Sequence, residues 1–472
     1  MTTLTTRELP LIGFMTALWA GGALLERFSL PALVGEILVG MALGPNGADI
    51  LPSDITIALQ TAGNIGLLLM VAEGGLMMEL SVLKAQGCRA TVLALTGTIL
   101  PVVIGGLFCM ALGYETTAAI ASGTALSSTA IGFTLRLMTD LKLLDTAQGQ
   151  LITAAAMLDD VFSLVLLAMI SVLDASTPHA SPPFGPPLPP GLPGSSHPPA
   201  LPPAAPRSGD DSEATAWLVM RPLVASLAIF AIAMLVGVAT LRADAVLSAG
   251  GQAGGVPKRS AAFAWLLAPS TTLGALLGGA VTLAWAADAL HSSALLGAFL
   301  AGTIFCSLGR AREAWQSVAP VQAWLATVFF GASVAFTIPT AALVEASSIG
   351  DGLLLTVAAI VGKFASGAWA APLRAPDGGF ASRPFWVAWT QVGSAMIGRG
   401  ELGFVLAKSA LDDGLLGSRA YCATVWALLL ATLLGPIAFR LSLRLSPRSP
   451  ADADAVPNGD AGGGVVMTSK AV

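Results

Sequence analysis

The stretch AAAMLDDVFSLVLLAM, residues 154–169, decides the fold, because it places two adjacent carboxylates inside an apolar run. A single Asp at the centre of a membrane helix costs about 2.5–3.5 kcal/mol on insertion scales. Asp159 and Asp160 together cost more, because like charges this close repel each other. A chain that keeps both carboxylates must gain something from them, so we interpret this pair as a functional site.

The composition of the whole chain is that of a membrane protein. Its 472 residues are 55% hydrophobic and 11% charged, whereas a soluble domain has roughly 25% charged residues. Apolar runs of about twenty residues recur, and that length spans a bilayer core. The formal net charge of −5 gives no case for a nucleic-acid partner, and the four cysteines lack metal-ligand spacing. We therefore predict a polytopic all-α membrane protein whose main partner is the lipid bilayer.

The apolar runs predict thirteen transmembrane helices. They lie near residues 8–25, 30–46, 57–78, 89–112, 116–138, 147–173, 216–241, 261–286, 291–308, 319–342, 349–372, 388–411 and 418–442. The first six and the last six would form two repeats of inverted topology, with the seventh helix as a linker. That arrangement, with a broken helix in each repeat, is the usual plan of a secondary transporter.

This count divides the chain into six segments. They are a first repeat at 1–173, a Pro-rich external loop at 174–215, a linker helix at 216–241, an internal loop at 242–260, a second repeat at 261–445 and a flexible cytoplasmic tail at 446–472. The Pro-rich loop holds thirteen of the chain's thirty prolines, so it cannot form a core. We interpret it as a tolerated insertion, and the sequence does not identify a partner for it.

Positive charges predict the orientation. With the N-terminus outside, sixteen of the 23 Lys and Arg residues fall on the inner side, and only Arg7, Arg207 and Arg419 fall outside. This asymmetry fits the positive-inside rule. We therefore expect a multi-pass protein with an external or lumenal N-terminus and a cytoplasmic C-terminus, and the kind of membrane stays open.

Polar residues interrupt the fifth helix of each predicted repeat. In the first repeat, ASGTALSSTAIGF at 121–133 contains Ser128 and Thr129. In the second, VGSAMIGRGELGF at 392–404 contains Arg399 and Glu401. Interrupted helices at matching places in two halves indicate a binding site, because unwound backbone presents carbonyl groups to a cation. Packing of small residues between helices is the structural alternative for the first stretch.

Three more charged residues lie in apolar surroundings. Lys363, within VAAIVGKFASGAWA, falls near the middle of a predicted helix, so it should pair with a carboxylate or lose its proton. Glu73 and Glu36 are candidates for lining a water-filled access path. For these two glutamates we favour a structural or access role over direct ligation of a cation.

The carboxylate pair suggests a chemistry of exchange. An ionised Asp160 in a dry, carbonyl-lined pocket attracts either a monovalent cation or a proton, and the two compete for one charge. Asp159 placed beside Lys363 would neutralise that ammonium. A site that must be occupied before it crosses the membrane gives exchange without leak, because moving an empty buried charge is too costly.

The chain resembles the cation:proton antiporter-2 family, in particular its thirteen-helix sodium/proton antiporters. The resemblance rests on the order of the motifs PALVGEILVGMALGP, GNIGLLLMVAEGGLMMEL, SSTAIGFTLRLM, AAAMLDDVFSLVLLA, LLGAFLAGTIF, VFFGASVAF, VGKFASGAW and SAMIGRGELGFVLA. It implies an elevator-type exchanger with a dimerisation domain and a mobile core, with two crossing broken helices. It also implies a homodimer that needs no cofactor and carries Na⁺, Li⁺ or K⁺ against H⁺.

The resemblance also implies roles for particular residues. Asp160 would be the main carboxylate for cation and proton, and Asp159 would be a second ion-binding carboxylate and the partner of Lys363. Thr129 matches the polar residue at the crossing of the broken helices. Two adjacent acidic residues imply electrogenic exchange, of Na⁺ or Li⁺ rather than K⁺.

Several other functions remain open at this point. A K⁺/H⁺ antiporter is the nearest alternative, and a sodium-coupled organic-anion symporter can share the inverted-repeat plan. A passive channel or an ion-regulated sensor is a further possibility. An intramembrane aspartyl protease also needs two membrane aspartates, but from different helices that face each other. Here they are adjacent on one helix, about 100° apart in direction, so we do not expect an enzyme.

Overall fold

The computed structural model describes residues 2–28, 30–130, 138–139, 143–144, 146–175, 211–250, 269–290, 292–370 and 383–444. Every regular element in these ranges is helical, which confirms the prediction of an all-α protein. The second half of the predicted fifth helix, nearly all of the Pro-rich loop and the C-terminal tail lie outside the described residues.

The elements follow one another along the chain as predicted from the apolar runs. The first part contains α1 (Thr2–Arg27), α2 (Ala32–Leu43), α3 (Ser53–Leu76), α4 (Leu80–Ala111), α5 (Thr116–Ala125), α7 (Ala147–Ala175) and α8 (Asp211–Gly250). The second part contains α10 (Pro269–Ala289), α11 (Ala294–Phe305), α12 (Gly309–Gln316), α13 (Ala319–Val328), the π-helical η1 (Phe329–Val334), the 3-10 turn η2 (Ala335–Thr337), α14 (Thr340–Leu343), α15 (Ala346–Ser366), the 3-10 turn η3 (Gly367–Ala370), α16 (Arg383–Ala395), α17 (Glu401–Asp412) and α18 (Ser418–Leu443).

The described helices are those of a multi-pass membrane protein. Nine of them are long and apolar enough to cross a bilayer, and α11 with α12, bent by 119° at their junction, would make a tenth. Large apolar side chains point outward, with Trp19, Leu235 and Trp285 exposed by 61%, 71% and 73%. An apolar surface this extensive needs lipid to cover it. The number of thirteen crossings stays a prediction.

Some predicted boundaries are wrong. The linker helix α8 runs from Asp211 to Gly250, so the ends of the expected loops at 174–215 and 242–260 are helical. Hydropathy marks only the apolar part of a helix, and Ala-rich flanks with good helix propensity extend it beyond that part. The predicted helix at 291–308 likewise ends at Phe305 and turns into α12.

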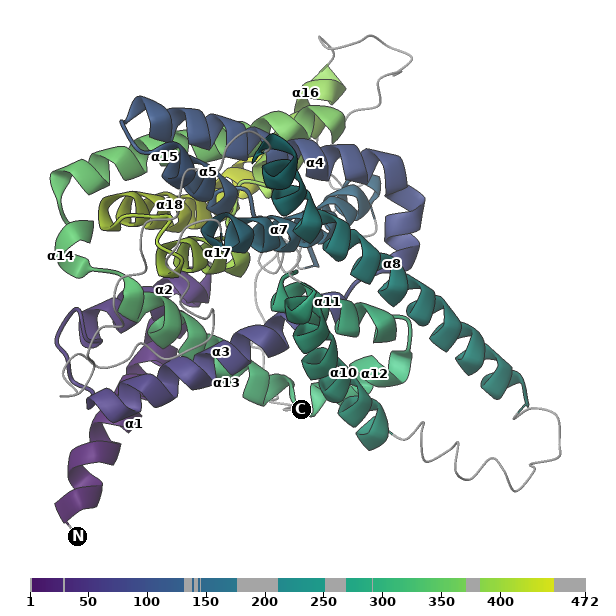
Figure 1. The fold of residues 1–472 in the computed structure, drawn as a ribbon, viewed down its shortest axis with the longest axis horizontal. Coiled ribbons are helices and arrows are strands. Elements are labelled where there is room, and N and C mark those ends of the chain that lie inside the picture. The colour runs from purple at the N-terminus through teal and green to yellow at the C-terminus, as the bar shows by residue number, and fades with distance from the viewer. Residues whose placement is uncertain are drawn as a thin grey trace, which may run out of the picture.

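The described helices form two groups (Figure 1). The core group consists of α4, α5, α7, α15, α16, α17 and α18, and the scaffold group consists of α1, α2, α3, α10, α11, α12 and α13. Within each group the helices pack extensively on one another, whereas few residues touch across the boundary. The long helix α8 contacts α7 of the core group and α10 and α11 of the scaffold group.

A polar cluster fastens three core elements at one end of the group. Tyr114, in the turn between α4 and α5, donates a hydrogen bond of 2.6 Å to Asp351 on α15. Arg419, at the start of α18, donates two bonds of 3.0 and 2.7 Å to the same carboxylate oxygen. This cluster fixes the start of α15 relative to the start of α5. Helix α15 carries Lys363, and α5 leads to Thr129.

Candidate ion-binding site

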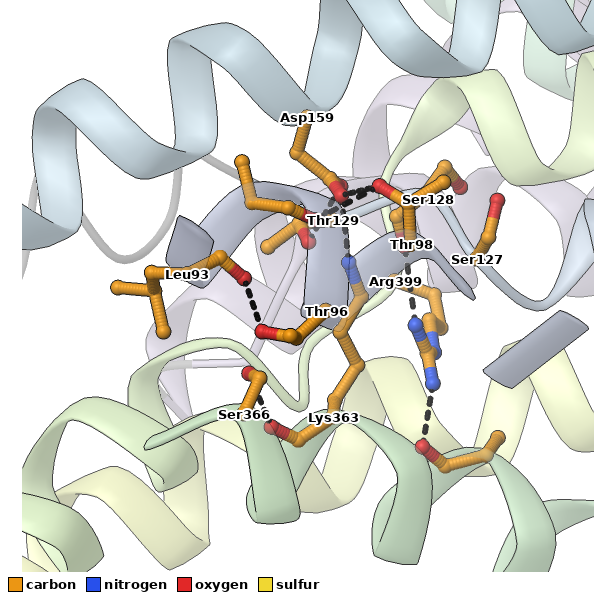
Figure 2. A network of polar contacts seen from close by, with 12 residues as sticks. Leu93, Thr96, Thr98, Ser127, Ser128, Thr129, Asp159, Lys363, Ser366 and Arg399 are labelled. Carbon is orange, nitrogen blue, oxygen red and sulfur yellow. Dashed lines mark hydrogen bonds and ion pairs between the residues drawn. The ribbon is translucent and has the colours of Figure 1, made fainter. Parts of the chain in front are cut away.

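Asp159 lies at the centre of the core group, on α7, with no exposed surface. Thr98 and Lys363 donate hydrogen bonds to its Oδ1, at 2.7 and 2.8 Å. Thr129 donates a third, of 2.7 Å, to Oδ2 (Figure 2). The carboxylate therefore accepts three bonds from α4, α15 and the segment after α5, so its charge is well satisfied without a bound cation.

The ion pair between Lys363 and Asp159 joins two side chains that are both 0% exposed. A close approach of α4 and α15 makes it possible, because a Cβ atom at Gly362 would lie 2.9 Å from the Cα of Pro101. Desolvation of two buried charges is expensive, so such a pair adds little net stability, but removing one partner strands the other. The contact between these two residues was expected from the sequence, and their roles in transport stay predictions.

Two unwound segments meet beside this ion pair. Helix α5 ends at Ala125, and the interval between α16 and α17 covers residues 396–400. The Ala130 amide donates a bond of 2.8 Å to the Gly398 carbonyl, which links the two unwound segments directly. A Cβ atom at Gly400 would lie 2.7 Å from the Thr129 carbonyl oxygen, so the crossing needs a residue without a side chain there.

We expect Gly400→Ala to separate the two breaks and lower cation-driven proton transport by about tenfold or more. The added methyl group would force the Thr129 backbone away and disturb its bond to Asp159, and such overpacking costs typically 1–3 kcal/mol. The measurement is the initial exchange rate of the variant in liposomes. Gly417→Ala is the matched control, because a Cβ atom there meets nothing within 4 Å. Equal rates for both variants would contradict this interpretation of the crossing.

Arg399 is a second buried cation at the crossing, with 0% exposure. Its guanidinium donates bonds of 3.2 Å to the Ser128 carbonyl and 2.6 Å to the Ala359 carbonyl (Figure 2). Its Nε has no partner, and Arg399 forms no ion pair with any carboxylate in the described ranges. One of these carbonyl groups follows the end of α5, and the other belongs to α15, so backbone oxygens of two core segments stabilise the guanidinium.

Asp160 differs from its neighbour in every contact. Its side chain is half-buried, and within the described ranges it takes part in no hydrogen bond or ion pair. Glu401, at the first position of α17, lies within electrostatic range of it. Asp160 is thus a carboxylate with free oxygens beside one whose oxygens are occupied. Its role as the carrier of cation and proton stays a prediction.

The structure places the two remaining candidates in the scaffold group, apart from the bonded network around Asp159. Glu36 on α2 accepts a bond of 3.0 Å from Thr327, and Glu73 on α3 accepts one of 3.0 Å from the Trp315 indole. Glu73 also lies within electrostatic range of Glu401 across the boundary between the groups. An access role for either glutamate stays a prediction.

Sequence reasoning missed Thr98 as a member of the site. Thr98 lies on α4, in an apolar stretch whose only polar side chains are two threonines. Tertiary packing alone brings it to Asp159. Thr98 also bonds the Ala94 carbonyl at 2.9 Å, as helical threonines commonly do. The available signal was a polar residue three positions before Pro101 in an apolar run.

We expect Thr98→Val to lower the thermal unfolding midpoint, whereas Thr98→Ser should keep it near the original value. The valine removes one donor to a buried carboxylate, and a hydrogen bond to a charged group contributes about 1.5–3 kcal/mol. The measurement is thermal unfolding of the purified protein in detergent. If the serine variant loses as much stability as the valine variant, the hydroxyl is not what matters at this position.

The fold and this site define a class of protein: a membrane transporter that is helical throughout its described elements, in which the unwound segment after α5 meets the break between α16 and α17 beside buried charges. The sequence matches the family described as sodium/hydrogen exchanger, transmembrane, over residues 14–444. The chain therefore belongs to the sodium/hydrogen exchanger family.

Individual relatives agree with this assignment. The chain is 23% identical over 416 residues to the Na(+)/H(+)-K(+) antiporter GerN of Bacillus cereus. This match covers 88% of this chain and 90% of the relative. It is 32% identical over 167 residues to Cation/H(+) antiporter 15 of Arabidopsis thaliana, but that match spans only 20% of the plant protein. By family the chain is a membrane cation/proton antiporter, and the two relatives carry that activity in their names.

A solved structure supports the fold. The sodium proton antiporter MjNhaP1 from Methanocaldococcus jannaschii superposes with a TM-score of 0.59, covering 93% of this chain and 99% of that one. The two sequences are 17% identical, so the likeness concerns the fold alone.

Proposed function

We propose that the protein exchanges Na⁺ or Li⁺ for H⁺ electrogenically, with Asp160 as the carboxylate that carries either ion. The observation that supports this most is the contrast within the Asp pair. Asp159 accepts three hydrogen bonds, one of them from Lys363, whereas Asp160 accepts none in the described ranges. A half-buried carboxylate with free oxygens between apolar helices requires neutralisation, and a cation and a proton can each supply it.

Alternating access in this proposal is a movement of the core group against the scaffold group. The Asp pair and Lys363 lie on core helices, and Thr129 and Arg399 lie in segments directly joined to them, so all would travel as one unit. The small number of contacts across the boundary favours sliding over local rearrangement. Glu36 and Glu73 would stay with the scaffold, where they could attract cations towards the path.

Potassium is the second candidate for the transported cation. The relative from Bacillus cereus, whose match covers 88% of this chain, carries both Na⁺ and K⁺ in its name. Hydroxyl and carboxylate oxygens suit all the alkali cations, so ligand chemistry alone does not exclude K⁺. Size and rigidity of the pocket around Asp160 would decide between them.

The test is reconstitution of the whole protein in liposomes that contain a pH indicator. A gradient of Na⁺, Li⁺ or K⁺ is imposed in turn, and the internal pH is recorded. Our proposal expects proton movement with Na⁺ and Li⁺, and weaker movement with K⁺. It also expects a dependence on an imposed membrane potential. Proton movement with K⁺ alone would favour the second candidate, and none with any cation would refute exchange.

We further propose the topology and assembly that the charges and the family resemblance imply. The N-terminus would lie outside and the C-terminus in the cytoplasm, and two copies would associate through the scaffold group. Cysteine labelling from either side of the membrane tests the first point, and the mass of the purified protein in detergent tests the second.

A further inference from the structure

Ser163 carries a buried hydroxyl one helical turn beyond the two aspartates. It is 1% exposed, and its Oγ makes no hydrogen bond within the described ranges. A buried serine in a helix ordinarily donates to the carbonyl four residues earlier, and Ser163 does not. An unsatisfied buried hydroxyl costs about 1–3 kcal/mol, so its retention calls for an explanation.

The position of Ser163 on α7 directs it towards the Asp pair. At 100° per residue, it lies about 60° from Asp160 and about 40° from Asp159 around the helix axis, and therefore between them. It lies about 4.5 Å beyond Asp160 along the axis. The Cα–Cβ bonds of a helix tilt towards its N-terminus, which is the direction of the two aspartates.

We propose that Ser163 Oγ is a ligand of the transported cation held at Asp160. This inference rests on the proposed function and assigns to the same site a neutral oxygen that has no hydrogen-bond partner in the described ranges. Asp160 supplies charge and Ser163 supplies a fixed oxygen in place of one hydration water. A cation that loses water on binding needs such replacement oxygens. With the cation bound, the serine proton can turn to the Asp159 carbonyl oxygen.

The test compares cation dependence of exchange in liposomes for the original protein and for variants at position 163. Ser163→Ala should raise the half-saturating Na⁺ and Li⁺ concentrations about tenfold, which corresponds to ~1.4 kcal/mol. The maximal rate should stay within about twofold, because Asp160 still carries the charge. Ser163→Thr, which keeps the hydroxyl, should restore the half-saturating concentration.

Two further variants control this experiment. Ser348, on α15, is also buried and unpartnered, but it precedes Lys363 by fifteen residues, or about 22 Å of helix. Ser348→Ala should therefore leave the cation dependence unchanged. Ser163→Cys keeps the size of the side chain but offers a sulfur atom, which hard cations bind poorly. Ser163→Cys should show the same tenfold increase in the half-saturating Na⁺ and Li⁺ concentrations. If Ser163→Ala does not fold, Ser163→Cys tests whether the hydroxyl is a cation ligand.

The outcomes separate this inference from the proposed function. If the original protein moves no protons under any cation gradient, the proposed function is wrong, and the Ser163 inference falls with it. If it exchanges ions but Ser163→Ala and Ser163→Cys keep its half-saturating concentrations, only the Ser163 inference is wrong. If Ser163→Ala lowers only the maximal rate, the effect is structural and the inference is refuted. The same holds if Ser348→Ala raises the half-saturating concentration as much as Ser163→Ala does.

Discussion

Replacing Asp160 by Asn is expected to abolish cation-driven proton movement, with a loss of at least about a hundredfold in initial rate, or ~2.7 kcal/mol. The amide keeps the size of the side chain but carries no charge, so it can neither bind a proton nor attract a cation. Asp159 cannot substitute for it, because Lys363 and two threonines already occupy its oxygens. The measurement is the internal pH of liposomes after an imposed Na⁺ gradient.

A matched control for this variant is Asp412→Asn. Asp412 lies at the end of α17, where it pairs with Lys408 and its side chain is 51% exposed. Exposed ion pairs contribute little, so its loss should leave the exchange rate within about twofold. If Asp160→Asn exchanges ions at the rate of this control, the assignment of Asp160 as the carrier is wrong.

Replacing Lys363 by Ala is expected to destabilise the protein strongly and to remove the response of exchange to membrane potential. The change leaves Asp159 as a buried charge with only two hydroxyl donors, and breaking a buried pair in this way costs about 3–5 kcal/mol. The thermal midpoint in detergent should fall by several degrees. In liposomes, an imposed potential should no longer accelerate exchange, because the core would carry one positive charge fewer.

The double variant Lys363→Ala with Asp159→Asn separates charge from packing. Removing both charges eliminates the stranded carboxylate, so most of the lost stability should return. If the double variant is as unstable as Lys363→Ala, the loss comes from the missing lysine side chain and not from the ion pair. An unchanged voltage response in Lys363→Ala would exclude Lys363 from charge coupling.

The helical architecture could be predicted because a bilayer imposes it. Apolar runs of about twenty residues have few alternatives to a helix in lipid, and each predicted helix has a helical counterpart in the structure. Helix ends outside the lipid obey no such constraint, which explains why α8 extends beyond its apolar stretch. The break between α16 and α17 could be anticipated from the glycines on either side of Arg399.

The candidate site could be predicted only where a residue is out of place in its own segment. Asp159, Asp160, Lys363 and Arg399 are conspicuous because charges in lipid are expensive. Thr98 and Ser163 are not, since a hydroxyl in a membrane helix ordinarily bonds its own backbone. Their importance depends on which partners tertiary packing provides: Thr98 has Asp159, whereas Ser163 has none among the residues that the structure describes.

The most direct test of the central claim is to add Na⁺ or Li⁺ to the purified protein in weakly buffered detergent solution and to measure proton release. If one carboxylate binds either a cation or a proton, cation binding must displace protons, and the release should saturate with cation concentration. Asp160→Asn should release none. Cation binding without proton release, or the same release from Asp160→Asn, would contradict the account.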